Sequence, residues 1–135
     1  MPSPNEPVVA ARLSLTIDGQ EIASFSKLAN MTSEVSYDSS GEPEPGTAQV
    51  EVVLERSMTR GTELAAWHQA AYSGAPAKRS CSLVVFGRDG APAVKYALKN
   101  AIPLKLEVEG IAVDGAQQLA ETLTLRCESV DRVNP

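Results

Sequence analysis

A two-residue alternation of apolar and polar side chains is the feature that most restricts how this 135-residue chain can fold. It is clearest near the start, where Leu13, Leu15 and Ile17 stand between polar residues. Successive side chains on a β-strand point to opposite faces of a sheet, so one face packs on a core and the other stays outside. The alternation recurs in most apolar segments, which predicts a mainly β protein whose function resides on its surfaces.

Turn signals divide the chain into about eight strands. The expected strands cover residues 11–18, 21–26, 31–38, 49–55, 80–86, 94–99, 104–109 and 122–127. Asp-Gly pairs at 18–19, 89–90 and 114–115 favour hairpin turns between these runs. The spacing is typical of a β-barrel or sandwich. We expect one domain over residues 11–135, preceded by an extended, proline-rich arm over residues 1–10.

One segment changes from strand periodicity to helix periodicity. Leu64, Trp67 and His68 recur at the spacing of one helix face, which predicts a flanking helix over about residues 60–72 with Thr59 as its N-cap. The single histidine has no second histidine with which to share a metal ion. We therefore interpret all three residues as core anchors that hold the helix to the sheet.

The charge distribution argues against nucleic acid as a specifically bound partner. The formal net charge is -5, and the basic residues form no run longer than Lys78-Arg79, whereas binding to a phosphate backbone requires a basic patch. No segment approaches the roughly 20 apolar residues of a membrane-spanning helix. The first residues also lack the basic and apolar regions of a signal peptide. We therefore expect synthesis in the cytoplasm and no membrane partner.

The two cysteines, Cys81 and Cys127, both lie in strand-like segments. Where a secretion signal is missing, such cysteines are usually reduced and buried. We interpret them as core thiols, and a disulfide bridge between them is the less favoured alternative.

The sequence lacks known catalytic motifs. It contains no Gly-rich phosphate loop, nucleophile elbow or Cys/His cluster, so no cofactor or metal ion is expected. Strand acids such as Glu51, Glu55, Glu107 and Glu109 would supply paired carboxylates to a minor hydrolase. Acids at i and i+2 are more often the solvated side of a strand. We predict a non-enzymatic protein, with a small ligand- or carbohydrate-binding β-sandwich as the main alternative.

Five segments in a fixed order resemble one known family. They are Leu15-Thr16-Ile17-Asp18-Gly19 leading to Ile22-Ala23-Ser24-Phe25-Ser26; Leu54-Glu55-Arg56-Ser57-Met58-Thr59; Arg88-Asp89-Gly90; Lys99-Asn100-Ala101-Ile102-Pro103 with Lys105; and Glu121-Thr122-Leu123-Thr124-Leu125 with Glu128. Together they resemble the tail tube proteins of contractile phages and the inner-tube proteins of extracellular contractile injection systems. These proteins are similar in fold to the Hcp tube of type VI secretion.

The resemblance implies a structural subunit that forms hexameric rings stacked into a hollow tube. Two long hairpins from each of six subunits would close into one inner barrel, which leaves no sheet edge open. The implied partners are a contractile sheath and baseplate or spike proteins, while effectors or DNA would pass through the lumen without specific binding. The particle would be a phage tail or an injection particle released outside the cell, and the sequence leaves this choice open. It also leaves open whether the chain forms the bulk tube or a ring near one end.

The resemblance also suggests which residues serve assembly. The turn-rich acidic loop is a candidate for ring stacking, and its alternative is a free surface loop. It comprises Ser40, Gly41, Glu42, Pro43, Glu44, Pro45 and Gly46. The polar side of the first strand, Arg12, Ser14, Thr16 and Asp18, is the candidate for the lumen side of an inner-barrel strand.

Overall fold

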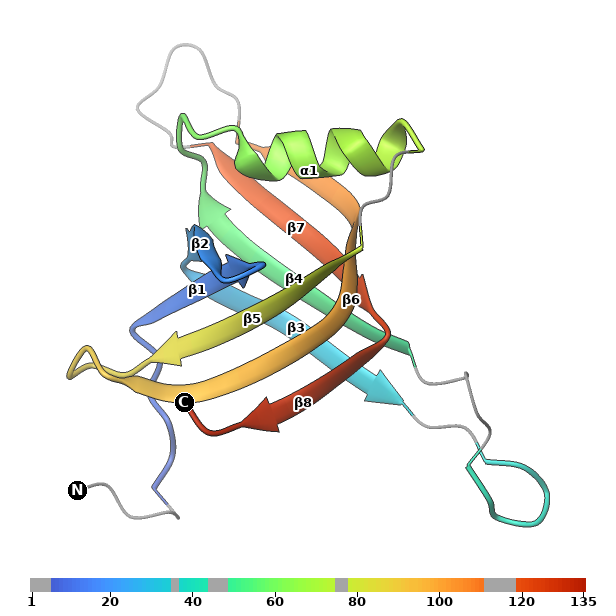
Figure 1. Ribbon diagram of the computed structural model, residues 1–135. Helices are drawn as coiled ribbons and strands as arrows, with labels where there is room; N and C mark the ends of the chain where they lie inside the picture. Colours follow the sequence, from blue (N-terminus) through green and yellow to red (C-terminus); the bar gives the residue numbers. More distant parts are fainter. Residues whose placement is uncertain (1–5, 35–36, 44–48, 75–77, 111–118) are drawn as a thin grey trace.

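The computed structural model describes residues 6–34, 37–43, 49–74, 78–110 and 119–135 (Figure 1). These ranges contain eight β-strands and one helix, in agreement with the predicted mainly β fold. The elements are β1 (Arg12–Ile17), β2 (Gln20–Phe25), β3 (Lys27–Glu34), β4 (Gln49–Ser57), α1 (Glu63–Tyr72), β5 (Arg79–Phe86), β6 (Pro92–Glu109), β7 (Ala120–Cys127) and β8 (Ser129–Val133).

All strand pairs are antiparallel, in the order β2-β1-β5-β6-β7-β4-β3, and β8 lies beside β6. Strand β6 bends and belongs to two layers (Figure 1). Residues 92–101 pair with β5 and β8, whereas residues 102–109 pair with β7. We call β2, β1, β5, the first half of β6 and β8 the β1 layer. We call β3, β4, β7 and the second half of β6 the hairpin layer, because it holds the long β3–β4 and β6–β7 hairpins.

The hydrophobic core lies between the inward faces of the two layers. Its fully buried side chains come from alternate positions on the strands, as the sequence pattern predicts, and from Leu64 on helix α1. The largest of them are Leu15, Leu54, Leu64, Leu83, Leu98, Leu123, Leu125, Val50, Val52 and Cys127. Because these side chains are mostly aliphatic, burial of their apolar area is the main stabilising contribution to the fold.

Helix α1 lies across one end of the two layers and contacts β6 and β2 (Figure 1). It begins at Glu63, so the predicted start near residue 60 and the predicted N-cap Thr59 are wrong. The Thr59 hydroxyl instead accepts a hydrogen bond from the Gly61 backbone N–H at 3.3 Å. Gly61 disfavours a helix through its backbone entropy, whereas the acidic Glu63 suits the first helical turn. Thr62 occupies the N-cap position.

Three strand boundaries differ from the sequence-based prediction. Strand β6 is continuous where two strands, 94–99 and 104–109, were expected. Strand β3 begins at Lys27 rather than near residue 31, because the Ser26 N–H donates to the Glu55 carbonyl at 2.9 Å and carries the chain directly into the second layer. Strand β8 was not predicted and is held by its pairing with β6. Each difference depends on pairing partners that are distant in the sequence.

The bend in β6 depends on Asn100, which has a φ of 50°. Its side-chain amide donates to the Glu128 carboxylate, and the Glu128 N–H donates to the Lys99 carbonyl at 2.9 Å. Glu128 lies between β7 of the hairpin layer and β8 of the β1 layer. These contacts therefore connect the two places at which the chain passes between the layers, the bend in β6 and the β7–β8 junction.

We expect Asn100→Val to lower the free energy of unfolding by about 1 to 3 kcal/mol, because a β-branched residue is strained at positive φ. Urea denaturation would measure the change. Asn100→Gly keeps the backbone conformation and serves as the matched control, with a smaller loss expected. Equal losses in the two variants would show that backbone strain at this bend is unimportant.

Candidate functional site

The outward face of the hairpin layer carries charges that are paired within the chain. Lys27 lies 3.6 Å from Glu55, Arg126 lies 4.0 Å from Glu51, and Lys105 lies 3.3 Å from Glu107. All of these side chains are substantially exposed to solvent. Three of the strand acids that would suit a hydrolase, Glu51, Glu55 and Glu107, therefore form a solvated, ion-paired surface.

The predicted lumen residues lie on the outward face of the β1 layer, not on the hairpin layer. Arg12 forms an exposed ion pair with Glu21 at 3.3 Å, and its guanidinium lies 4.2 Å from the centroid of the Phe86 ring. Ser14 is 4% exposed, in register with Ser24 on β2 and Val84 on β5. This serine is nearly covered within the single chain.

Thr16 and Asp18 complete the predicted group at the other end of β1. Thr16 is half-buried, while Asp18 is exposed, has a φ of 51° and lies 3.6 Å from the Arg79 guanidinium. Their assignment to a lumen remains a prediction.

A hollow of about 840 Å³ lies on the same outward face of the β1 layer. Its floor includes the small side chains of Thr16 and Ser82, and its charged lining includes Lys95, Lys99 and Asp131. Ala97 pairs with Asp131 in the β6–β8 ladder, so the aspartate is diagonal to both lysines. The hollow thus combines small side chains with charged ones.

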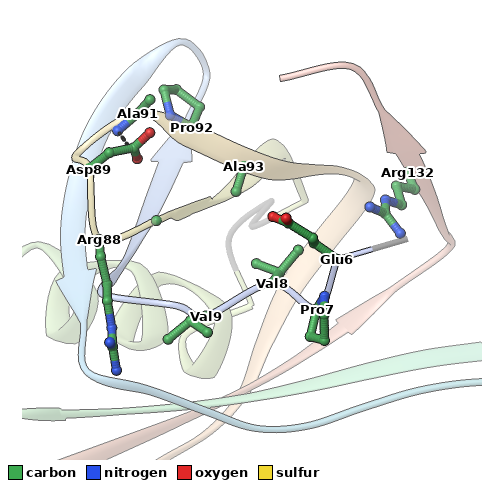
Figure 2. Close-up of a pocket in the computed structure, with 11 residues that line it drawn as sticks. Glu6, Pro7, Val8, Val9, Arg88, Asp89, Ala91, Pro92, Ala93 and Arg132 are labelled. Carbon is green, nitrogen blue, oxygen red and sulfur yellow. Dashed lines mark hydrogen bonds between the residues drawn. The ribbon is translucent and has the colours of Figure 1, made fainter. Parts of the chain in front are cut away.

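A second cavity, of about 490 Å³, lies between the N-terminal arm and the β5–β6 turn (Figure 2). The arm contributes residues 6–9, the turn region contributes residues 87–89 and 91–93, and β8 contributes Arg132. Val8 and Val9 are each half-exposed, and the arm joins the sheet where the Ala11 N–H donates to the Phe86 carbonyl at 2.8 Å. Residues 6–10 of the arm therefore form no strand and lie beside the turn between β5 and β6.

The acidic loop between β3 and β4 contains a compact turn over residues 37–43. Asp38 accepts hydrogen bonds from the Ser40 N–H at 2.9 Å, the Ser40 hydroxyl at 2.6 Å and the Glu42 N–H at 3.0 Å. These hydrogen bonds, from Ser40 first and then from Glu42, lower the pKa of Asp38. Gly41 has a φ of 87°, and Tyr37 forms a β-bridge with Pro43.

This turn projects beyond the ends of β3 and β4 (Figure 1). Its side chains, including those of Ser40 and Glu42, are exposed. The predicted stacking residues Glu44, Pro45 and Gly46 lie outside the described residues.

The predicted helix anchors lie on the inner side of α1. Leu64 and Trp67 are buried in the core, while His68 is half-buried. The exposed aromatics on the turn and on α1, Tyr37 and Tyr72, lie on different elements. A carbohydrate-binding module would present aromatic side chains on a concave face, and Trp67 is not available for that role.

A buried ion pair joins β4 to β7. The Arg56 Nη2 lies 2.7 Å from the Glu121 Oε1, and the Arg56 Nε donates to the same oxygen at 2.8 Å. Both side chains are 7% exposed, and the guanidinium lies 5.5 Å from the centroid of the Phe25 ring. This pair was not predicted from the sequence, although both residues continue the inward-facing alternation that runs through Leu54 and Leu123.

The hairpin layer has two edges at which, among the described strands, no neighbour pairs. Strand β3 pairs only with β4, and residues 102–109 of β6 pair only with β7. The second edge carries two exposed apolar side chains, Leu104 at 38% and Val108 at 44%. Exposed strand edges of this kind are surfaces for pairing with another chain.

Cys81 and Cys127 are free, buried thiols, in agreement with the favoured interpretation. Burial raises the pKa of Cys127 from 9.0 to about 11. Burial, and then the nearby Cys127 and Asp18, raise that of Cys81 to about 12.

These shifts predict that stability falls as the pH rises above 9. Unfolded thiols ionise there while folded thiols keep their protons, so the unfolded state binds fewer protons and each thiol lowers the free energy of unfolding by up to about 1.4 kcal/mol per pH unit. Urea denaturation at pH 8, 9 and 10 would measure this slope. A variant with both Cys81→Ala and Cys127→Ala is expected to show a shallower slope, and an unchanged slope would contradict the explanation.

Within the described ranges, no three His, Cys, Asp or Glu side chains lie together as a metal site requires. None of the helical residues that the structure describes forms a segment long and apolar enough to cross a membrane.

Comparison with models of known protein families identifies the family of this chain. The family model for the T4-like virus tail tube protein gp19 matches residues 9–131. The chain belongs to this tail tube family. The resemblance found in the sequence is thereby confirmed, and with it the prediction of a structural protein rather than an enzyme. Comparison with curated protein sequences finds no match.

Solved structures have the same fold as this tail tube protein. A chain of the sheath/tube terminator of the PVC extracellular contractile injection system, in its extended state, matches with a TM-score of 0.74 at 16% identity, covering 98% of this chain and 100% of that one. A chain of the PVC sheath-tube complex matches with a TM-score of 0.71 at 16% identity, covering 98% and 95%. Hcp1 from Flavobacterium johnsoniae matches with a TM-score of 0.56 at 19% identity, covering 91% and 95%.

Proposed function

We propose that this chain is the repeating subunit of a hollow tube inside a contractile particle, assembled as hexameric rings that stack end to end. Membership of the tail tube family supports the proposal. The observation that carries it is the hairpin layer, whose two long hairpins lie side by side with an open edge on each side.

Ring closure would use these two different edges. Strand β3 of one subunit would pair with residues 102–109 of the next, and head-to-tail contacts of this kind close into rings. The pairing would satisfy the free backbone groups and cover Leu104 and Val108. A continuous inner barrel would then have no exposed edge.

The outward face of the hairpin layer would line the lumen. Its cations are already paired with acids in the same chain, as in Arg126 with Glu51. Such a wall would hold neither DNA nor folded effectors tightly, because it offers them no cluster of free positive charge. The β1 residues Arg12, Ser14, Thr16 and Asp18 would then face away from the lumen, opposite to the sequence-based prediction.

Selective labelling would decide between the two lumen assignments. Arg126 and Arg12 are about equally exposed, at 45% and 48%, and each has an exposed ion pair. We expect Arg126→Cys to react with a maleimide polymer too large for the lumen only before tube assembly. Arg12→Cys should react both before and after assembly. The reverse pattern would place β1 at the lumen.

The remaining assembly contacts belong to the same proposal. The acidic loop over residues 40–46 and the arm over residues 1–10 would contact neighbouring rings, with residues 11–135 as the tube-forming domain. Sheath and baseplate or spike proteins would contact the assembled tube, with cargo passing through it.

Electron microscopy of the purified protein tests the proposal as a whole. We expect six-fold rings or tubes whose yield rises with protein concentration, because neighbouring subunits stabilise one another. Monomers alone at every concentration tested would refute it.

A further inference from the structure

Two lysines in the hollow of the β1 layer have no acidic partner within the described part of the chain. No described carboxylate forms an ion pair with Lys95 or Lys99. Asp131 lies diagonal to both across the β6–β8 ladder, and Asp18 at the rim is paired with Arg79. The hollow therefore keeps an excess of positive charge in a protein whose net charge is -5.

The hairpin layer differs in this respect. Its outward cations, Lys27, Lys105 and Arg126, each lie within 4.0 Å of a carboxylate. Exposed cations are easily paired on a strand surface, where opposite and diagonal neighbours are close. Among the described residues, the β1 layer is thus the face that carries exposed lysines without an ion pair, and the hollow beside them gives an acidic group room to enter.

The chain itself carries an acidic element of suitable shape. The turn over residues 37–43 projects from the body (Figure 1). Its Glu42 side chain is exposed. Hydrogen bonds from Ser40 and Glu42 to Asp38 stabilise the conformation of the turn. A preordered element loses little conformational entropy when it binds. Glu42 has no ion-pair partner among the described residues, so its carboxylate is free to contact another subunit.

We propose that the hollow of the β1 layer receives the acidic turn of a second copy in the adjacent ring, with Glu42 between Lys95 and Lys99. This inference rests on the proposed function, because it names the acceptor for the stacking loop. The small side chains of Thr16 and Ser82 leave space for the turn. Charge-assisted hydrogen bonds from the lysines to the carboxylate define the register between rings.

Charge reversal tests the contact directly. We expect Lys95→Glu with Lys99→Glu to reduce the fraction of rings found in tubes by at least about tenfold, because like charges then face each other. Adding Glu42→Lys to that variant should restore tubes. The matched control reverses two exposed cations, Arg60 and Lys78, that lie outside the hollow and outside both open edges, and it should form tubes normally. Ring formation is measured by native mass spectrometry, and tube length by negative-stain microscopy.

The readouts separate failure of this contact from failure of the proposed function. Absence of rings in the unmodified protein would overturn both. Tubes that survive deletion of residues 42–45 would overturn the stacking role of the loop, and the contact with it. Loss of tubes on that deletion, together with normal tubes from the Lys95→Glu, Lys99→Glu variant, would overturn only the docking site. Recovery of tubes when Glu42→Lys is added to that variant would support the docking site.

Discussion

Replacing Glu121 with glutamine is expected to lower the free energy of unfolding by about 3 to 5 kcal/mol. The substitution keeps the side-chain volume but leaves the Arg56 guanidinium buried without a counter-charge, only 7% exposed between two strands. An uncompensated buried charge is among the most destabilising changes in a protein. Denaturation in urea, followed by circular dichroism, would measure the loss.

The matched control is Glu51→Gln, which removes an exposed carboxylate on β4 from its 4.0 Å contact with Arg126 on β7. We expect this change to cost less than about 1 kcal/mol, because solvent screens exposed pairs. Replacing both Arg56 and Glu121 by apolar residues of similar volume should recover most of the stability. A loss below about 1 kcal/mol for Glu121→Gln would show that the pair is dispensable.

Leu104→Asp is expected to abolish ring formation while the monomer remains folded. Leu104 lies at an irregularity in the β6–β7 register, on the open edge of the hairpin layer, and is 38% exposed. A charge at this edge would have to be desolvated when another strand pairs there, which is how natural proteins prevent edge pairing. Size-exclusion chromatography with light scattering would report the oligomeric state.

Tyr72→Asp provides the control, because Tyr72 is also an exposed apolar residue but lies on helix α1, which is not a strand of either open edge. This variant should assemble normally, and both variants should unfold at nearly the same urea concentration as the unmodified protein. Normal rings from Leu104→Asp would exclude this edge from the subunit interface.

More of the core than of the surface was predictable from the amino-acid sequence. Leu13 and Leu15 are buried where the alternation places them, and Leu64 and Trp67 hold α1 to the layers. Helix α1 nevertheless begins three residues later than expected, at Glu63, because Gly61 lies in the turn before it. Patterns of period 2 and 3.6 identify the buried face of an element better than its ends.

The candidate site was only partly predictable. The acidic loop stood out by composition, and its Asp38 turn follows from known side-chain to backbone hydrogen bonding. The hollow around Lys95 and Lys99 gave no local signal, because β1, β5, β6 and β8 all contribute to it. Arg56 and Glu121 are 65 positions apart, so their pairing depends on the β4–β7 register.

The amino-acid sequence by itself determined which side chains face inward, and the order of its segments indicated the tail tube family. These properties are local, because alternation along a strand depends only on neighbouring residues. Only the tertiary structure decided that β6 bends at Asn100 to join two layers. It also decided that Arg12, Ser14, Thr16 and Asp18 lie on the outward face of the β1 layer, which points away from the hairpin layer. Those features depend on hydrogen bonds between strands distant in the sequence, which no local pattern specifies.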